Sequence, residues 1–298
     1  MGLAACGGGG GGGGGGHHGT TAQWSDIFSA GIISALEDGV IIETSDDLGT
    51  QAQAQAQSAS AHMGIAATSS SDDTHFFSIK IEDGVLIIND YKDVRNTSHH
   101  ATEPDVYEVP LTAFNAETGR AIASTFGGWG EIDIQFGGKN AGLGYAEFGF
   151  WNHYGAGNPT DDPSPLVFVF SSAPETYLPS DATFTGKAFG VMVEGEGGNQ
   201  IVTSRQGTAE LAIVGSQQNL TANFGTWGNL SCPDCANASV FYLEDDPFTL
   251  NSFASQFYGD SDGREVVGLL MGRNQDTPVK DFMVSFGMCD VGAGCKPQ

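Results

Sequence analysis

The residues best placed to do chemistry are four cysteines toward the end of the chain. Two form the motif Cys232-Pro233-Asp234-Cys235, and Cys289 and Cys295 follow with five residues between them. Such cysteines form local disulfides in an exported protein, or bind zinc as four thiolates, for which the second spacing is loose. A redox pair at Cys232 and Cys235 is a third hypothesis, but nothing around it resembles the βα setting of such motifs. Because each pair is close in sequence, we favour the disulfides Cys232–Cys235 and Cys289–Cys295.

A fifth cysteine lies in the amino-terminal segment. Leu3-Ala4-Ala5-Cys6 resembles a bacterial lipobox, in which the cysteine is diacylated and becomes the mature amino terminus. Only five residues precede Cys6, whereas a secretory signal has a basic start and about 7–15 apolar residues. We therefore expect a start site further upstream; N-myristoylation of Gly2 and an incidental cysteine are the alternatives. Export to an oxidising compartment favours the two disulfides, and we predict no metal site.

A run of ten glycines, Gly7 to Gly16, follows the lipobox-like residues. Polyglycine is a flexible coil, so the segment from Gly7 to Gln23 would span roughly 20–25 Å on average. We expect residues 1–23 to form a lipobox-like start and a tether that holds a folded body away from a membrane surface.

Sequence motifs of catalysis are missing from the chain. It contains no G-x-S-x-G, no H-E-x-x-H and no P-loop, so we predict no catalytic residues, no cofactor and no enzymatic activity. His153, between Asn152 and Tyr154, is the starting point for a haem-ligand hypothesis, with an exposed loop histidine as the simpler interpretation. Trp129, Trp151 and Trp227 would either line a partner-binding surface or pack in the core.

The charge of the chain excludes two classes of partner. It has 36 Asp and Glu against 11 Lys and Arg, a formal net charge of −25 in 298 residues. A phosphate backbone requires clustered basic residues, and so does anionic lipid. No stretch approaches 18 apolar residues. We therefore expect no nucleic acid partner, and membrane contact only through an amino-terminal lipid.

Residues 24–123 have mixed character. The spacing of apolar residues from Ser25 to Leu36 predicts a short helix. The low-complexity stretch 50–71 is either a helix by propensity or a disordered loop. Alternation over 77–81, a turn at Glu82-Asp83-Gly84 and the apolar run 85–88 predict a β-hairpin.

From about residue 124 onward, apolar and polar residues alternate over short runs separated by turns. Ten such runs predict about eight or nine strands; they lie near residues 132–136, 146–150, 167–170, 182–192, 209–213, 220–224, 240–243, 253–258, 265–271 and 282–286. Closing an antiparallel series into a barrel removes its edges, and eight strands leave room only for side chains inside. We predict an all-β fold with an eight-stranded antiparallel barrel, and a β-sandwich is the alternative.

Several short motifs in this region carry a family resemblance. They are Tyr177-Leu178-Pro179-Ser180-Asp181-Ala182-Thr183-Phe184-Thr185-Gly186-Lys187-Ala188-Phe189-Gly190, Gly207-Thr208-Ala209-Glu210-Leu211, Leu220-Thr221-Ala222-Asn223-Phe224-Gly225, Phe257-Tyr258-Gly259, Arg264-Glu265-Val266-Val267-Gly268 and Val284-Ser285-Phe286-Gly287. In order and spacing they resemble the barrel domain of transferrin-binding protein B and related surface lipoproteins. Asn223 and Val267 depart from the pattern, which commonly has Asp and Gly there. The motif glycines are explained physically by close packing or sharp coiling of a small barrel.

The resemblance implies a domain organisation and a function. Residues 24–123 would form a small β-rich handle-like segment and residues 124–298 the barrel domain. The chain would be a monomeric lipoprotein, anchored at the bacterial outer membrane or cell surface, that binds a partner protein or a small molecule such as haem in iron-carrier or haem acquisition. The family's contacts lie on variable loops, so no binding residue is transferred.

Two alternatives to this function stay open. One is a lipoprotein that binds a host factor in immune evasion. The other is a structural or envelope barrel, against which the polar residues of the outward strand faces argue. Those residues are Glu131, Asp133, Gln135, Thr183, Lys187 and Asn223.

The lipid anchor is open to a direct test. Cys6→Ser in a full-length precursor should release the protein from membranes, because the thiol that carries the lipid is gone. Fractionation followed by immunoblotting measures the distribution, and retention of the variant in the membrane fraction would contradict the lipoprotein hypothesis.

Overall fold

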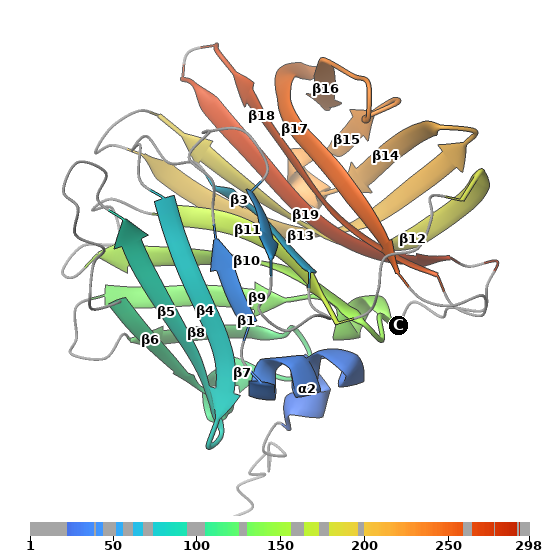
Figure 1. Cartoon of the computed structure of the whole chain (residues 1–298). Coiled ribbons are helices and arrows are strands. Elements are labelled where there is room, and N and C mark those ends of the chain that lie inside the picture. The colour runs from blue at the N-terminus through green and yellow to red at the C-terminus, as the bar shows by residue number, and fades with distance from the viewer. Residues whose placement is uncertain are drawn as a thin grey trace, which may run out of the picture.

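The fold is all-β with a closed eight-stranded antiparallel barrel (Figure 1). The computed structural model describes residues 23–38, 40–43, 52–55, 62–67, 74–93, 105–124, 130–155, 164–172, 179–195, 200–258, 264–276, 278–290 and 292. Within these residues a four-stranded sheet, a seven-stranded sheet and the barrel pack on one another, and two short helices lie at one end.

The barrel confirms the predicted architecture. Its strands in order are β12 (Asp181–Glu194), β13 (Ile201–Val214), β14 (Gln217–Asn223), β15 (Asn229–Cys232), β16 (Val240–Leu243), β17 (Asp246–Tyr258), β18 (Glu265–Asn274) and β19 (Lys280–Asp290). Each pairs antiparallel with the next, and β12 pairs with β19 to close the ring. Buried phenylalanines fill the interior, among them Phe184, Phe241 and Phe282, each 0% exposed. The interior is therefore a packed core.

Two details of the barrel differ from the sequence prediction. The first barrel strand begins at Asp181, so the strands near 132–136, 146–150 and 167–170 do not belong to it. The short strand β15 was not predicted, because its sequence Asn-Leu-Ser-Cys alternates over only four residues between turns. Alternation shows which face of a strand is buried, but not which neighbour the strand pairs with.

The strands wrongly assigned to the barrel belong to the seven-stranded sheet. In spatial order its strands are β2 (Ala52–Gln55), β3 (His62–Ala67), β11 (Ser164–Ser171), β10 (Ala146–Gly155), β9 (Gly130–Phe136), β8 (Arg120–Ser124) and β7 (Phe114–Asn115). β9 joins the sheet by pairing with β8, and β11 by pairing with β3. The non-barrel part therefore continues past residue 123 to residue 171. β2 and β3 also correct the expectation of a helix or a disordered loop over 50–71, because pairing in a sheet overrides weak local propensity.

The four-stranded sheet contains the predicted hairpin. Its strands in spatial order are β1 (Val40–Glu43), β4 (Thr74–Glu82), β5 (Val85–Asp93) and β6 (Asp105–Pro110). Asp83 and Gly84 connect β4 to β5, and both have positive φ, 48° and 79°, as a two-residue hairpin turn of the primed type requires. The predicted helix near 25–36 is present as two, α1 (Trp24–Ile27) and α2 (Ala30–Asp38), separated at Phe28 and Ser29.

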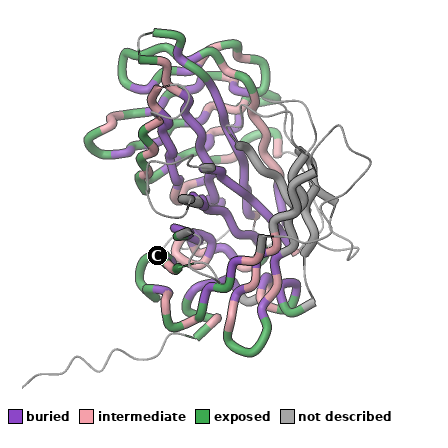
Figure 2. Tube along the Cα trace, turned by 90° about the vertical axis from the view of Figure 1, so that its left-hand side faces the viewer, coloured by how far each residue is buried: buried purple, intermediate pink, exposed green. Residues whose placement is uncertain are grey.

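The central strands of the seven-stranded sheet, β10 and β11, are buried on both faces. In β11, Leu166, Phe168 and Phe170 pack against the four-stranded sheet and the helices, whereas Val167 and Val169 pack against the barrel. Figure 2 shows continuous buried segments through the strands, with exposed residues concentrated in turns. Burial on both faces explains why this strand is apolar throughout its centre.

The barrel strands that meet this sheet are likewise apolar on both faces. In β18, Val266 and Leu270 point into the barrel core. Val267, Leu269 and Met271 pack against the seven-stranded sheet, which is called the central sheet below. Ser285 donates a hydrogen bond from Oγ to the carbonyl of Gly149, at 2.7 Å, across this interface. The outward face of the barrel is therefore not polar where the sheet covers it.

Close approach at this interface requires a glycine at position 287. A β-carbon there would overlap the ring of Phe148, which is 0% exposed and cannot move into solvent. Gly287→Ala should lower the free energy of unfolding by about 1–3 kcal/mol through overpacking. Denaturant titration of Gly287→Ala, Phe148→Leu and the double variant tests this cause, because the smaller leucine should reduce the penalty. An equal penalty in both backgrounds would show that the overlap is not its source.

Candidate functional site

A cavity of about 350 Å³ opens between the central sheet and the barrel. Strands β8, β9 and β10 supply one wall, and β12, β13 and the short 3₁₀ helix η4 (Gly225–Trp227) supply the other. Figure 1 shows the seven-stranded sheet beside the barrel. Cavities of this size hold small molecules.

Three polar side chains from adjacent strands line the sheet wall of the cavity. Asp133 of β9 lies opposite Asn152 of β10 in the strand register. Arg120 of β8 donates to Asp133 through Nε, at 2.8 Å to Oδ1, and through Nη2, at 2.6 Å to Oδ2. The bidentate geometry fixes the guanidinium and neutralises a carboxylate that is only 5% exposed.

This wall contains the polar face that the sequence predicted for β9. The prediction placed that face outward, whereas the structure buries it. Asp133 and Gln135 alternate with apolar residues as expected, but they are 5% and 6% exposed and do not face solvent. Gln135 donates from Nε2 to the carbonyl of Thr118, at 2.7 Å. Thr183 and Asn223, on the barrel, are exposed as predicted.

The Asn152 amide lines the cavity and has an unpaired hydrogen-bond acceptor. The residue is 3% exposed, and its Oδ1 has no hydrogen-bond partner within the described part of the chain. A buried amide oxygen without a partner is unfavourable by about 1–3 kcal/mol. The amide is therefore available to a bound molecule or a water.

The barrel wall contributes a second arginine. Arg205 of β13 places its Cζ 5.3 Å from the ring centroid of Trp227 in η4, a cation–π contact. Trp227 in turn packs edge-on against Phe282 of the barrel core, at 5.9 Å between centroids. No carboxylate of the described residues pairs with Arg205.

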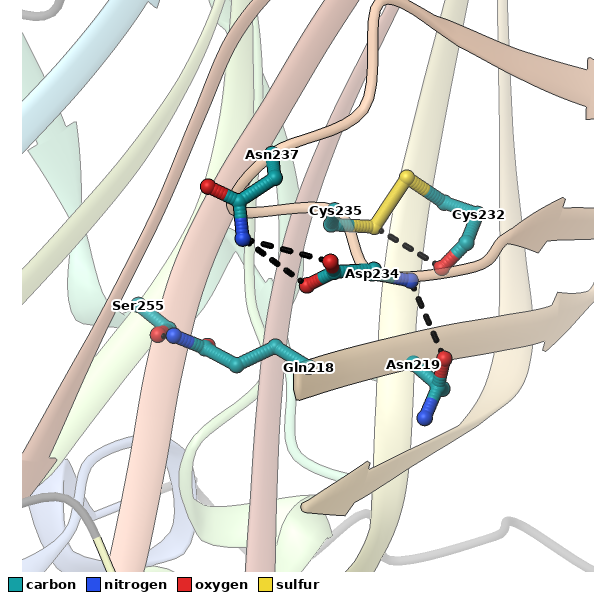
Figure 3. The surroundings of a disulfide bond; sticks show 7 residues. All are labelled: Gln218, Asn219, Cys232, Asp234, Cys235, Asn237 and Ser255. Atoms are coloured by element: carbon teal, nitrogen blue, oxygen red, sulfur yellow. Dashed lines mark hydrogen bonds between the residues drawn. A yellow bond between two sulfur atoms is a disulfide. The ribbon is translucent and has the colours of Figure 1, made fainter. Parts of the chain in front are cut away.

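The predicted disulfide Cys232–Cys235 is present and closes the turn after β15 (Figure 3). Both residues are buried, at 1% and 2% exposure, and belong to the barrel core. Asp234 in the turn donates its N–H to Oδ1 of Asn219, at 3.0 Å. A buried disulfide fits a structural crosslink rather than an exposed redox pair, and its sulfurs are not zinc thiolates.

Cys289 at the end of β19 is also disulfide-bonded. Its predicted partner Cys295 lies outside the described residues, and so does the predicted lipid attachment site Cys6. The pairing Cys289–Cys295 stays a prediction.

Two buried glutamates connect the parts of the molecule near η2 (Lys139–Ala141). Glu147 of β10 accepts N–H bonds from Ser29, at 2.8 Å, and from Gly138, at 2.7 Å. Glu265 of β18 accepts from the N–H groups of Gly144, at 2.6 Å, and Tyr145, at 3.1 Å. Glu147 thereby ties the helical segment to the central sheet, and Glu265 ties the barrel to the same loop.

Burial raises the pKa of both carboxyl groups. Desolvation dominates for Glu147 and, with repulsion from Glu265, raises its pKa to about 8 against the backbone N–H groups that lower it. The pKa of Glu265 is raised by desolvation as well. Every oxygen of the pair accepts from the backbone, so we assign the pair a structural role.

The remaining sequence predictions concern His153 and three tryptophans. His153 is in strand β10, not in a loop, and its backbone pairs with Ile132 and Ser164. Trp151 is buried between the sheets, and Trp129 lies outside the described residues. Of Trp151 and Trp227, the two that the structure describes, only Trp227 lines the cavity. Sequence reasoning missed Arg120, Asn152 and Arg205, which carry no motif.

No protein-family model matches the chain, and no curated protein matches it. Within the described residues, no group of three or more His, Cys, Asp or Glu side chains could hold a metal ion. Among those same residues, no helix is long and apolar enough to cross a membrane.

The raised pKa of Glu147 makes a pH-dependent contribution to stability. The folded protein retains this proton up to about pH 8, whereas the unfolded chain releases it near pH 4.5. The contribution is thus complete below the unfolded pKa, and the unfolding free energy should fall by up to about 5 kcal/mol as pH rises from about 4.5 to above 8.

Glu147→Gln should remove this slope. The amide does not titrate, although it loses one acceptor toward the backbone, so it lowers stability most at acidic pH and progressively less as pH rises. Denaturant midpoints measured from about pH 5 to about pH 9 compare the two proteins, with the exposed Glu131→Gln as control. A wild type and variant that differ by a constant amount at every pH would contradict the assignment.

Proposed function

We propose that this protein is an exported, lipid-anchored binding protein of the bacterial outer membrane or cell surface, acting in iron-carrier or haem acquisition. The observation that carries the proposal is the barrel core, in which buried aromatic and aliphatic side chains pack against one another. A barrel with a packed core would recognise a partner through its loops and outer face.

The construction of the body supports a binding scaffold. The barrel is fixed to the central sheet by a continuous apolar interface and by hydrogen bonds through Ser285 and Glu265. A rigid body of this kind presents loops in defined positions, which reduces the entropy lost on binding. The disulfide Cys232–Cys235 is consistent with export to an oxidising compartment.

The lipoprotein resemblance supplies the iron-related part of the proposal. Several of its motif glycines lie on barrel strands: Gly268 of β18, for example, leaves no room for a β-carbon between the Phe286 ring and the Ala254 carbonyl. This packing explains the glycine without reference to a ligand.

Haem and an iron carrier are tested separately. The full chain is titrated with haemin and the Soret absorbance is followed; immobilised chain is then exposed to iron-loaded and iron-free transferrin. A saturable Soret shift, or retention that prefers the iron-loaded carrier, is expected. Denatured chain is the control for non-specific haem association. If neither haemin nor the carrier binds, the iron-acquisition role is wrong.

A further inference from the structure

The cavity beside the barrel has the opposite charge to the rest of the molecule. Two of the chain's 11 basic residues, Arg120 and Arg205, line it, together with a single acid, Asp133. The lining therefore has one net positive charge in a chain whose formal net charge is −25. A cavity with this balance attracts an anion and repels a cation.

The two arginines differ in whether a carboxylate neutralises them. Arg120 is already neutralised by the bidentate contact with Asp133, so it orders the wall and contributes little free charge. Arg205 has its guanidinium positioned by the Trp227 ring and lacks a carboxylate partner among the described residues. Arg205 is thus the group that can bind an anionic oxygen, with the planar fork that suits a carboxylate.

Polar groups on the opposite wall indicate which hydrogen-bonding groups a ligand should carry. The Asn152 amide has an unpaired Oδ1, and rotation about its last side-chain bond exchanges the oxygen with the NH₂ group. Asp133 also retains acceptor lone pairs beyond those that Arg120 uses. A ligand that carries hydroxyl or amino groups would satisfy these atoms.

The remaining lining sets the size of the ligand. Phe150 and Val191, at 2% and 1% exposure, form an apolar wall, and the volume of about 350 Å³ exceeds that of an inorganic anion. Such a wall is complementary to a carbon skeleton.

We infer that this cavity binds a small organic carboxylate that bears hydroxyl or amino groups, with Arg205 holding the carboxylate and Asn152 and Asp133 holding the donors. Because Arg120 already neutralises Asp133, the guanidinium of Arg205 is the one charge of the lining without a carboxylate partner among the described residues, and it matches a ligand with one negative charge. The inference goes beyond the proposed iron-related function and does not depend on it.

Calorimetric titration of the full chain with D-glucuronate, gluconate and L-glutamate tests the inference. Glucose and inorganic phosphate serve as the uncharged and the inorganic comparison. At least one of the three acids should bind with a dissociation constant below about 10 mM, bind more weakly as salt is added, and raise the melting temperature.

Variants connect binding to the cavity. Arg205→Gln should lower the affinity for the acid about tenfold or more, because it removes the free charge of the lining. Arg205 is exposed, so the substitution should leave the core undisturbed. Asn152→Ala should lower the affinity for the acid by a smaller factor. Lys80→Gln removes the same charge from the exposed face of β4 and should leave affinity unchanged.

Four results would overturn the inference. They are no binding by any of the acids, unchanged affinity in Arg205→Gln, glucose as tight as glucuronate, and binding of phosphate alone. Each is distinguishable from failure of the haemin and transferrin tests, which leaves the small-acid titration unaffected.

Discussion

Burial of the central strands of the seven-stranded sheet, β10 and β11, on both faces is the constraint on which the rest of the molecule depends. One face holds the four-stranded sheet and the helices, and the other holds the outer surface of barrel strands β12, β18 and β19. Neither the barrel nor the four-stranded sheet presents a fully polar exterior, because each uses part of that exterior as an interface. The apolar area shared by the layers therefore makes them one body rather than two linked domains.

Polar groups occur in this interface only where they are satisfied or where a cavity remains. Glu147, Glu265 and Ser285 each bond to backbone atoms of another element, so they add direction to a contact that apolar packing alone would leave free to slide. Arg120, Asp133 and Asn152 lie where the sheet and the barrel separate. The same docking thus produces both the rigid body and the cavity within it.

The two functional proposals use different parts of this body. Recognition of an iron carrier or haem draws on the resemblance and on a barrel whose core is filled. Recognition of a small acid draws on charges and an unpaired amide beside that barrel. The two proposals are physically compatible, because loops at the ends of the barrel and a cavity at its side can both belong to one rigid body.

Much of the fold could be predicted from the sequence, because alternation of apolar and polar residues with a period of two identifies a strand and its buried face. Seven of the eight barrel strands were predicted in this way, and so were the hairpin with its Asp83-Gly84 turn and the Cys232–Cys235 disulfide. The partners of a strand depend on contacts between distant residues, which is why β9, β10 and β11 were assigned to the wrong sheet. The cavity was beyond prediction for the same reason. Arg120, Asn152 and Arg205 are unremarkable where they stand in the chain, and only the docking of a barrel on a sheet brings them to one place.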